Sequence, residues 1–180
     1  MIIWLNGTFG VGKTTTTGHL VRDDARLRAF DPEWVGYLLA NNLQDHPVSD
    51  FQHYPSWRRL VPVVADEIAR FTGQHLVAAQ SVLVEDYWDE IRGGVTALGH
   101  EVFHVVLDAD AETLHARIDS DVDEPERVRP WRHRHVEVWE AARPWLLGAA
   151  DLVVDTAALD APRAARQVHD AVTQRVRAGC

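Results

Sequence analysis

The stretch Gly7-Thr8-Phe9-Gly10-Val11-Gly12-Lys13-Thr14 fits the pattern G-x-x-x-x-G-K-[ST]. It follows the apolar run 2–5, which is typical of a strand buried on both faces, and it leads into a helical pattern over 12–22. In such a loop the backbone amides curl around a phosphate chain, and the helix N-terminus adds partial positive charge. The sequence therefore predicts a phosphate-binding loop (P-loop) here, rather than an ordinary glycine-rich turn.

The P-loop contains a residue type that the rest of the chain does not use. Of the 18 lysine and arginine residues, 17 are arginine, and Lys13 is the only lysine. A lysine is a compact point charge, whereas an arginine is a broad planar fork, so this position is expected to require the ammonium. We expect Lys13 to bridge the β- and γ-phosphates of ATP and the Thr14 hydroxyl to hold Mg²⁺. The residues expected to bind the nucleotide are Gly7, Phe9, Gly10, Val11, Gly12, Lys13, Thr14 and Thr15.

Length and composition predict one domain over residues 1–180. Hydrophobic residues make up 46% of the chain and charged residues 25%, which is ordinary globular composition. The formal net charge of −9 argues against general binding of nucleic acid, and no apolar run is long enough to span a membrane. The N-terminus lacks the features of a signal peptide, and the single cysteine, Cys180, has no partner for an internal disulfide. We therefore expect a cytoplasmic protein with a small-molecule substrate. The oligomeric state stays open.

Strand and helix patterns alternate beyond the P-loop. Strands are expected at 27–30, 76–79, 102–107 and 152–154, and helices at 33–42, 55–72, 87–98, 111–118, 130–147 and 161–177. Helices between strands imply parallel pairing, so the prediction is an α/β fold, a three-layer α/β/α sandwich around a five-stranded parallel sheet. On the helix 55–72, we expect one stripe to face the core: Leu60, Val63, Val64, Ile68 and Phe71.

Two motifs that other classes of P-loop protein use do not occur in this sequence. With no second lysine, the chain lacks the N-K-x-D motif by which GTPases read guanine. The strand 76–79 continues into Gln80-Ser81, without the acidic residue typical of motor ATPases. The remaining class is the small kinase type, with an arginine-bearing helical lid expected over 119–134.

In this lid, arginines would neutralise charge on the transferring phosphoryl group. We expect Arg117 and Arg127 to be catalytic and Arg129 to bind the nucleotide. A solvated charged loop is the alternative for each of these arginines, and it is favoured for Arg132 and Arg134.

Three segments in the first third of the chain resemble the tunicamycin-resistance protein family. They are Ile2-Ile3-Trp4 with Asn6-Gly7, Phe9-Gly10 and Gly12-Lys13-Thr14; Asp31-Pro32-Glu33 with Gly36; and Asp50-Phe51-Gln52 with Tyr54-Pro55 and Trp57-Arg58. The resemblance implies an ATP-binding protein of the nucleoside- and shikimate-kinase type. It also implies resistance to an antibiotic that carries uridine and sugars, through phosphorylation of the drug. The C-terminal part is shorter than in the family.

The residues expected on the acceptor side follow the second strand. Asp31 is placed to hold an acceptor hydroxyl and take its proton, because ligands of open parallel sheets lie beyond the carboxyl ends of the strands. A helix N-cap is the alternative for Asp31, and Glu33 is expected to complement the helix dipole. Gln52, Trp57 and Arg58 are expected to bind substrate, although a surface helix and core packing are alternatives.

These features predict an ATP- and Mg²⁺-dependent kinase acting on a hydroxyl of a small molecule, with a nucleoside antibiotic of the tunicamycin type as the expected acceptor. Sequestration of a drug without chemistry, or a housekeeping nucleotide or sugar kinase, are the alternatives. No set of histidine, cysteine and acidic residues has the spacing of a structural metal site.

Overall fold

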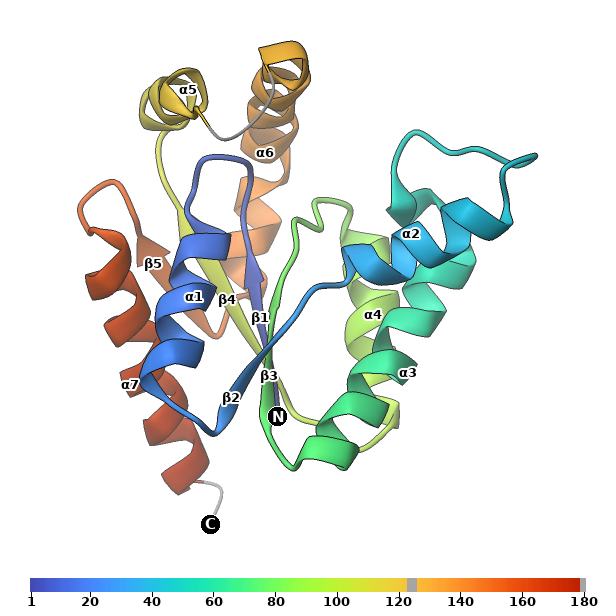
Figure 1. Ribbon diagram of the computed structural model, residues 1–180. Helices are drawn as coiled ribbons and strands as arrows, with labels where there is room; N and C mark the ends of the chain where they lie inside the picture. The colour runs from blue at the N-terminus through green and yellow to red at the C-terminus, as the bar shows by residue number, and fades with distance from the viewer. Residues whose placement is uncertain (123–125, 179–180) are drawn as a thin grey trace.

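A five-stranded parallel sheet forms the centre of the protein (Figure 1). The computed structural model describes residues 1–122 and 126–178. The strand order is β2-β3-β1-β4-β5, so β1 lies in the middle and the P-loop leaves its carboxyl end. The strands are β1 (Ile2–Asn6), β2 (Leu27–Phe30), β3 (His75–Ala79), β4 (Val102–Asp108) and β5 (Leu152–Asp155).

Helices cover both faces of the sheet, as the three-layer prediction requires. In Figure 1, α1 and α7 lie on one side of the strands and α3 and α4 on the other, while α5 and the start of α6 stand beyond the carboxyl ends of the strands. The helices are α1 (Lys13–Asp23), α2 (Glu33–Asn42), α3 (Pro55–Thr72), α4 (Glu85–Ala97), α5 (Ala111–Ser120), α6 (Arg129–Ala149) and α7 (Ala161–Ala178). Two 3₁₀ turns, η1 (Phe51–His53) and η2 (Glu126–Val128), precede α3 and α6. None of the described helices is long and apolar enough to cross a membrane.

The face that α3 buries differs from the predicted stripe. Phe71 is 93% exposed and Val63 is 44% exposed, so this part of the stripe points away from the core. The fully buried face consists of Trp57, Arg58, Val61, Pro62, Ala65, Asp66 and Ala69. The prediction was wrong for Val63 and Phe71, whereas Leu60, Val64 and Ile68 are half-buried and pack against the core. Small residues let α3 approach α4 closely. At Gly94 of α4, an added Cβ would lie 2.8 Å from the Pro62 side chain.

Charged residues on the buried face of α3 are tolerated because each has a partner. The Asp66 carboxylate accepts from His100 Nε2 at 2.6 Å and from Arg70 Nε at 2.6 Å. These hydrogen bonds lower the pKa of Asp66 below its ordinary value, the bond from His100 contributing most. A hydrophobic pattern cannot anticipate this face, because its polar members are satisfied by residues distant in the sequence.

The start of α2 packs closely against η1 through a glycine. A Cβ at Gly36 would lie 2.3 Å from the Phe51 ring, which leaves no room for any side chain at this position. The Phe51 ring in turn meets the Tyr37 ring at a centroid distance of 5.0 Å. Gly36 therefore fixes how the segment after β2 lies against the segment before α3.

We expect Gly36→Ala to destabilise the protein by roughly 1–3 kcal/mol, because overpacking against Phe51 outweighs the gain in helix propensity of about 1 kcal/mol. Gly93→Ala is the matched control, since Gly93 is also inside a helix but an added Cβ there meets no atom within 4 Å. It should leave the free energy of unfolding unchanged or raise it. Urea denaturation measures both. Equal stability of the two variants would contradict this packing.

Candidate active site

The P-loop connects β1 to α1 and has the backbone conformation that its glycines allow. Gly7 has φ +141° and Gly12 has φ +94°, values that side chains of L-residues rarely adopt. At Gly7 an added Cβ would also lie 2.7 Å from the Leu107 carbonyl oxygen of β4. Thr14 and Thr15 lie exposed in the first turn of α1. The loop thus has the shape that the motif predicted.

The Lys13 ammonium lies inside the loop and is held by the loop's own carbonyls. Its Nζ donates to the Gly7 oxygen at 3.0 Å and to the Thr8 oxygen at 2.9 Å. It also lies 5.7 Å from the centroid of the Phe9 ring. Burial lowers the pKa of Lys13 to about 7, and the positive charge of Arg132 lowers it further, against the opposing effect of Glu33. The loop therefore holds a half-buried cation that makes no ion pair with a carboxylate of the described residues.

Two carboxylates lie at the start of α2, and the charge of one of them, Glu33, acts on this cation. Glu33 is half-buried, and burial together with the charge of Asp31 raises its pKa, while a hydrogen bond with Tyr37 and the charge of Lys13 lower it. Sequence reasoning assigned Glu33 to the helix dipole and did not anticipate its electrostatic effect on the P-loop lysine. The signal was its place two residues after Asp31, in the first turn of a helix that begins at the carboxyl end of a strand.

Asp31 is exposed, and one of its oxygens acts as a cap. Its Oδ1 accepts from the Glu33 backbone N–H at 2.9 Å, the bond that the N-cap alternative predicted. Its Oδ2 has no hydrogen-bond partner among residues 1–122 and 126–178. The capping bond and a contact with an acceptor are thus compatible, and the catalytic role of Asp31 stays a prediction.

Of the predicted substrate-binding residues, Trp57 is corrected by the structure. Its side chain is 0% exposed and its Nε1 donates to the Pro32 carbonyl oxygen at 3.0 Å. The indole therefore belongs to the core beneath α2 and has no surface left for a substrate, as the core-packing alternative anticipated.

Gln52 and Arg58 join three elements near the site. Arg58 Nε donates to Glu90 Oε2 of α4 at 2.8 Å, its guanidinium stacks on the Tyr87 ring at 4.1 Å, and its Nη1 donates to the Gln52 carbonyl oxygen. The Gln52 side chain donates to the Ser81 carbonyl oxygen at 2.9 Å. These hydrogen bonds fix η1 against α3, α4 and the loop after β3. Direct contact of either side chain with a substrate stays a prediction.

The start of α6 lies over the P-loop. The Phe9 ring meets the Trp131 ring at a centroid distance of 4.8 Å, and the Thr8 hydroxyl donates to the His135 carbonyl oxygen at 3.3 Å. The Arg132 guanidinium lies 5.3 Å from the centroid of the Phe9 ring, and its Nη1 donates to Asp121 Oδ2 at 2.7 Å. The expectation that Arg132 is a solvated surface residue is therefore wrong.

The other arginines of the predicted lid are placed differently. Arg127 is exposed and Arg129 is half-buried, and neither makes an ion pair with a residue that the structure describes. Residues 123–125, in the middle of the predicted lid, lie outside the described residues. Arg117 donates to the Gly10 carbonyl oxygen at 3.3 Å and to the Thr156 carbonyl oxygen at 2.6 Å. It thereby joins the P-loop to the loop after β5.

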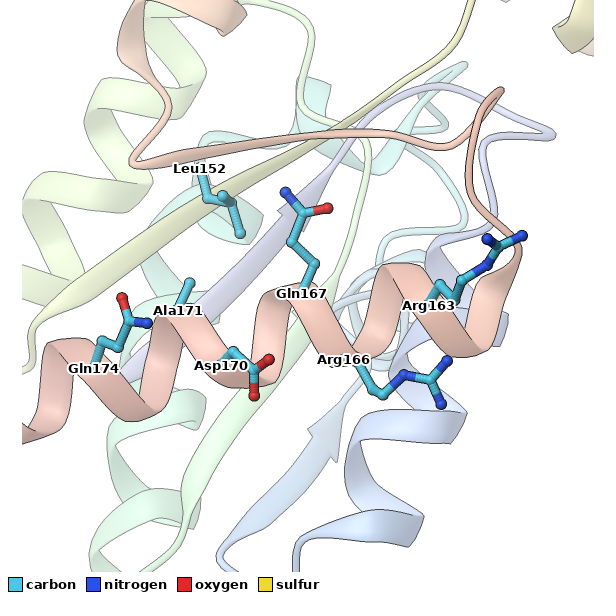
Figure 2. Close-up of a pocket in the computed structure, with 7 residues that line it drawn as sticks. All are labelled: Leu152, Arg163, Arg166, Gln167, Asp170, Ala171 and Gln174. Carbon is cyan, nitrogen blue, oxygen red and sulfur yellow. The ribbon is translucent and has the colours of Figure 1, made fainter.

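A shallow hollow on the outside of the protein is separate from this arrangement (Figure 2). It lies on α7 beside the first residue of β5. Its lining consists of Leu152, Arg163, Arg166, Gln167, Asp170, Ala171 and Gln174. None of the residues predicted to bind nucleotide or acceptor is among them, so the hollow contributes nothing to the candidate site.

Comparison of the whole structure with solved structures identifies a small-kinase fold. The tunicamycin resistance protein of Deinococcus radiodurans is 25% identical, with a TM-score of 0.77 over 95% of this chain and 94% of that one. This similarity confirms the resemblance found in the sequence motifs. A sugar kinase from a Janibacter species is 19% identical, with a TM-score of 0.67 over 96% of this chain and 94% of that one.

A third structure has the same fold. The shikimate kinase of Acinetobacter baumannii, solved with shikimate, is 18% identical, with a TM-score of 0.61 over 97% of this chain and 93% of that one. No protein-family model and no curated protein matches the sequence. The P-loop kinase-like α/β sandwich predicted from the sequence is thus confirmed.

The lowered pKa of Lys13 predicts that nucleotide binding takes up a proton. At pH 8 the free ammonium, with a pKa of about 7, is mostly neutral, and an incoming phosphate chain raises that pKa and favours the charged form. Calorimetric titration with MgATP at pH 8, in buffers of different ionisation enthalpy, should show uptake approaching one proton, and much less at pH 6. Uptake near zero at pH 8 would contradict the lowered pKa.

The same pKa predicts how the free protein responds to pH. The unfolded chain, with an ordinary lysine pKa, holds this proton more tightly than the folded protein does. The contribution of Lys13 to the free energy of unfolding therefore rises between about pH 7 and pH 10. Comparison of wild type with Lys13→Met by urea denaturation across this window isolates the contribution.

Proposed function

We propose that this protein is an ATP-dependent phosphotransferase that acts on a hydroxyl group of a small molecule, and that the acceptor is a nucleoside antibiotic of the tunicamycin type. The observation that carries the proposal is the P-loop geometry, in which the Gly7 and Thr8 carbonyls hold the Lys13 ammonium and the charge of Glu33 at the start of α2 acts on it. The similarity to a tunicamycin resistance protein supports the acceptor class, and the kinase fold supports the reaction type.

On the donor side, the P-loop would bind the phosphates of ATP through its backbone amides and the first turn of α1. Lys13 would exchange the Gly7 and Thr8 carbonyls for β- and γ-phosphate oxygens, which supply the full counter-charge that the loop lacks. Arg132, which lies close enough to affect the pKa of Lys13, is the side chain best placed to stabilise charge on the transferring group.

The residues present fit a magnesium ion at the phosphates. Thr14 presents a hydroxyl in the first turn of α1, and Gln80 at the end of β3 has a buried side-chain oxygen, Oε1, without a hydrogen-bond partner among the described residues. Oxygen donors of this kind suit Mg²⁺ and the waters it keeps. Thr14 would hold the ion, Gln80 Oε1 would accept from one of its waters, and the ion would neutralise charge on the β- and γ-phosphates.

On the acceptor side, Asp31 would orient the attacking hydroxyl with its uncapped oxygen. Burial and the charge of Asp31 raise the pKa of Glu33, so Glu33 would be a second candidate to accept the proton that the hydroxyl loses. The hydrogen bond that Oδ1 makes to the Glu33 N–H fixes the Asp31 carboxylate at the mouth of the site. Because phosphoryl transfer has a loose transition state, alignment contributes more here than proton removal does.

The remaining arginines have separate proposed roles. Arg117 would hold the P-loop against the loop after β5 through its hydrogen bonds to Gly10 and Thr156. In this role it would lie beside the nucleotide rather than at the transferring group. Arg127 and Arg129 are proposed to contact the phosphates from the far side of the site, since neither is held by an ion pair in the described part of the chain.

Incubation with MgATP and a panel of acceptors tests the proposal. The panel contains tunicamycin-type nucleosides, common nucleotides, sugars and shikimate, and mass spectrometry reads the gain of one phosphoryl group. Phosphorylation of a tunicamycin-type compound is the expected result. Tight drug binding without mass gain would establish sequestration instead, and transfer only to a nucleotide or sugar would establish a housekeeping kinase.

Lys13→Arg should nearly abolish turnover even though it keeps the positive charge. The broad guanidinium cannot fit between the Gly7 and Thr8 carbonyls, where Nζ sits at 3.0 and 2.9 Å. Loss of a well-placed charge at the transition state costs roughly 3–4 kcal/mol, or 10²–10³-fold in turnover. Steady-state assays on the acceptor found above measure it, and turnover within tenfold of wild type would contradict the requirement for lysine.

Asp31→Asn should lower turnover by about 10²-fold while leaving ATP affinity close to wild type. An asparagine oxygen still accepts from the Glu33 N–H, so the cap and the stability are kept. Asp31→Ala is the control for capping and should in addition lose roughly 1 kcal/mol of stability. If Asp31→Asn keeps full turnover per folded molecule, Asp31 is only a cap.

A further inference from the structure

The last residue of β1 makes a hydrogen-bonding arrangement that the P-loop motif does not explain. Asn6 is 0% exposed. Its Oδ1 accepts from the Gly7 N–H at 2.9 Å and from the Val82 N–H at 2.9 Å, and its Nδ2 donates to the Val82 carbonyl oxygen at 3.0 Å. One side chain thus joins the first peptide of the P-loop to the loop that follows β3.

The second N–H of the Asn6 amide points to a buried histidine of β4. Asn6 Nδ2 lies 3.5 Å from His104 Nε2, and His104 Nδ1 lies 3.1 Å from the Ala149 carbonyl oxygen at the end of α6. A carbonyl can only accept, so Nδ1 carries the proton and Nε2 accepts from Asn6. The ring is 1% exposed and packs on the Trp88 ring at 4.1 Å.

Only the neutral form of His104 fits this arrangement, since a protonated Nε2 would face an amide N–H. Burial lowers the pKa of His104 to about 4. The charged groups that act on it are Asp151, which raises the pKa and accepts from the His104 backbone N–H at 2.9 Å, and Arg92 of α4, which lowers it. The imidazole is therefore a fixed acceptor throughout the physiological range.

We propose that Asn6 and His104 are positioning residues that hold the P-loop in its nucleotide-binding conformation. The Asn6 oxygen fixes the Gly7 N–H, and the carbonyl of the same residue accepts from Lys13 Nζ, so both peptides of Gly7 are held. His104 completes the four hydrogen bonds of the amide, so the Asn6 side chain has one orientation. This inference rests on the nucleotide-binding half of the proposed function and is independent of the acceptor.

The test compares nucleotide affinity in three variants, using a non-hydrolysable ATP analogue with Mg²⁺. His104→Leu removes the acceptor for the Asn6 N–H and should weaken binding roughly tenfold. His104→Gln keeps an acceptor within reach of Asn6 and should stay within about threefold of wild type. His100→Leu is the control. His100, which precedes β4, hydrogen-bonds to Asp66 of α3, and this bond does not involve the P-loop.

The control separates positioning from general destabilisation. His100→Leu is expected to lower thermal stability without changing nucleotide affinity. If His104→Leu also loses stability but binds the analogue as wild type does, the Asn6–His104 pair is only structural and the proposal falls. A wild-type protein that binds no nucleotide would instead overturn the proposed function, and the two failures are therefore distinct.

A second measurement needs no ligand. Nitrogen NMR of wild type should show His104 as the neutral Nδ1–H tautomer down to about pH 5. Asn6→Asp keeps an acceptor for the Gly7 and Val82 N–H groups, but it removes the donor to the Val82 carbonyl and to His104. The carboxylate that replaces this donor should raise the pKa of His104, with at least a tenfold gain in proton affinity. An unchanged titration of His104 in this variant would show that the two side chains do not interact.

Discussion

The rest of the site depends on one desolvated ammonium. Two backbone carbonyls, rather than a carboxylate, accept hydrogen bonds from Lys13 Nζ. These bonds fix where the ammonium lies, but they do not neutralise its charge. Burial, not a neighbouring group, is the largest cause of its lowered pKa. An anion is the group that resolves this imbalance, and a polyphosphate chain is the anion whose shape matches a curled backbone and a helix N-terminus.

Two charged side chains of opposite sign, on two different helices, act on the Lys13 ammonium. Arg132, at the start of α6, lowers the pKa of Lys13, whereas Glu33, at the start of α2, raises it. In the proposed reaction, a phosphoryl group would need its charge neutralised on the side of Arg132 and an acceptor hydroxyl oriented on the side of Glu33. The charges at the starts of the two helices are compatible with the proposed transfer.

The sequence predicted the sandwich and the P-loop because both follow from local patterns, namely apolar strands between helices and glycines at fixed spacing. It could not predict the face of α3, because Arg58 and Asp66 are buried only through partners in other elements. The placement of Arg132 likewise depends on how α6 crosses the Phe9 ring. Asn6 and His104 are 98 residues apart, and only adjacent parallel strands bring them together.

The proposed donor and acceptor halves of the site differ in the burial and hydrogen bonding of their side chains. The proposed donor half is held by hydrogen bonds of the buried Asn6 and His104 and of the half-buried Arg117 to Thr156. The proposed acceptor half lies on α2, where Trp34 is 71% exposed and Tyr37 is 46% exposed. A side chain on this surface can change without disturbing the P-loop. Under the proposed function, substrate choice would depend on α2 and η1 and nucleotide binding on the P-loop, and the same fold occurs in kinases for different small molecules.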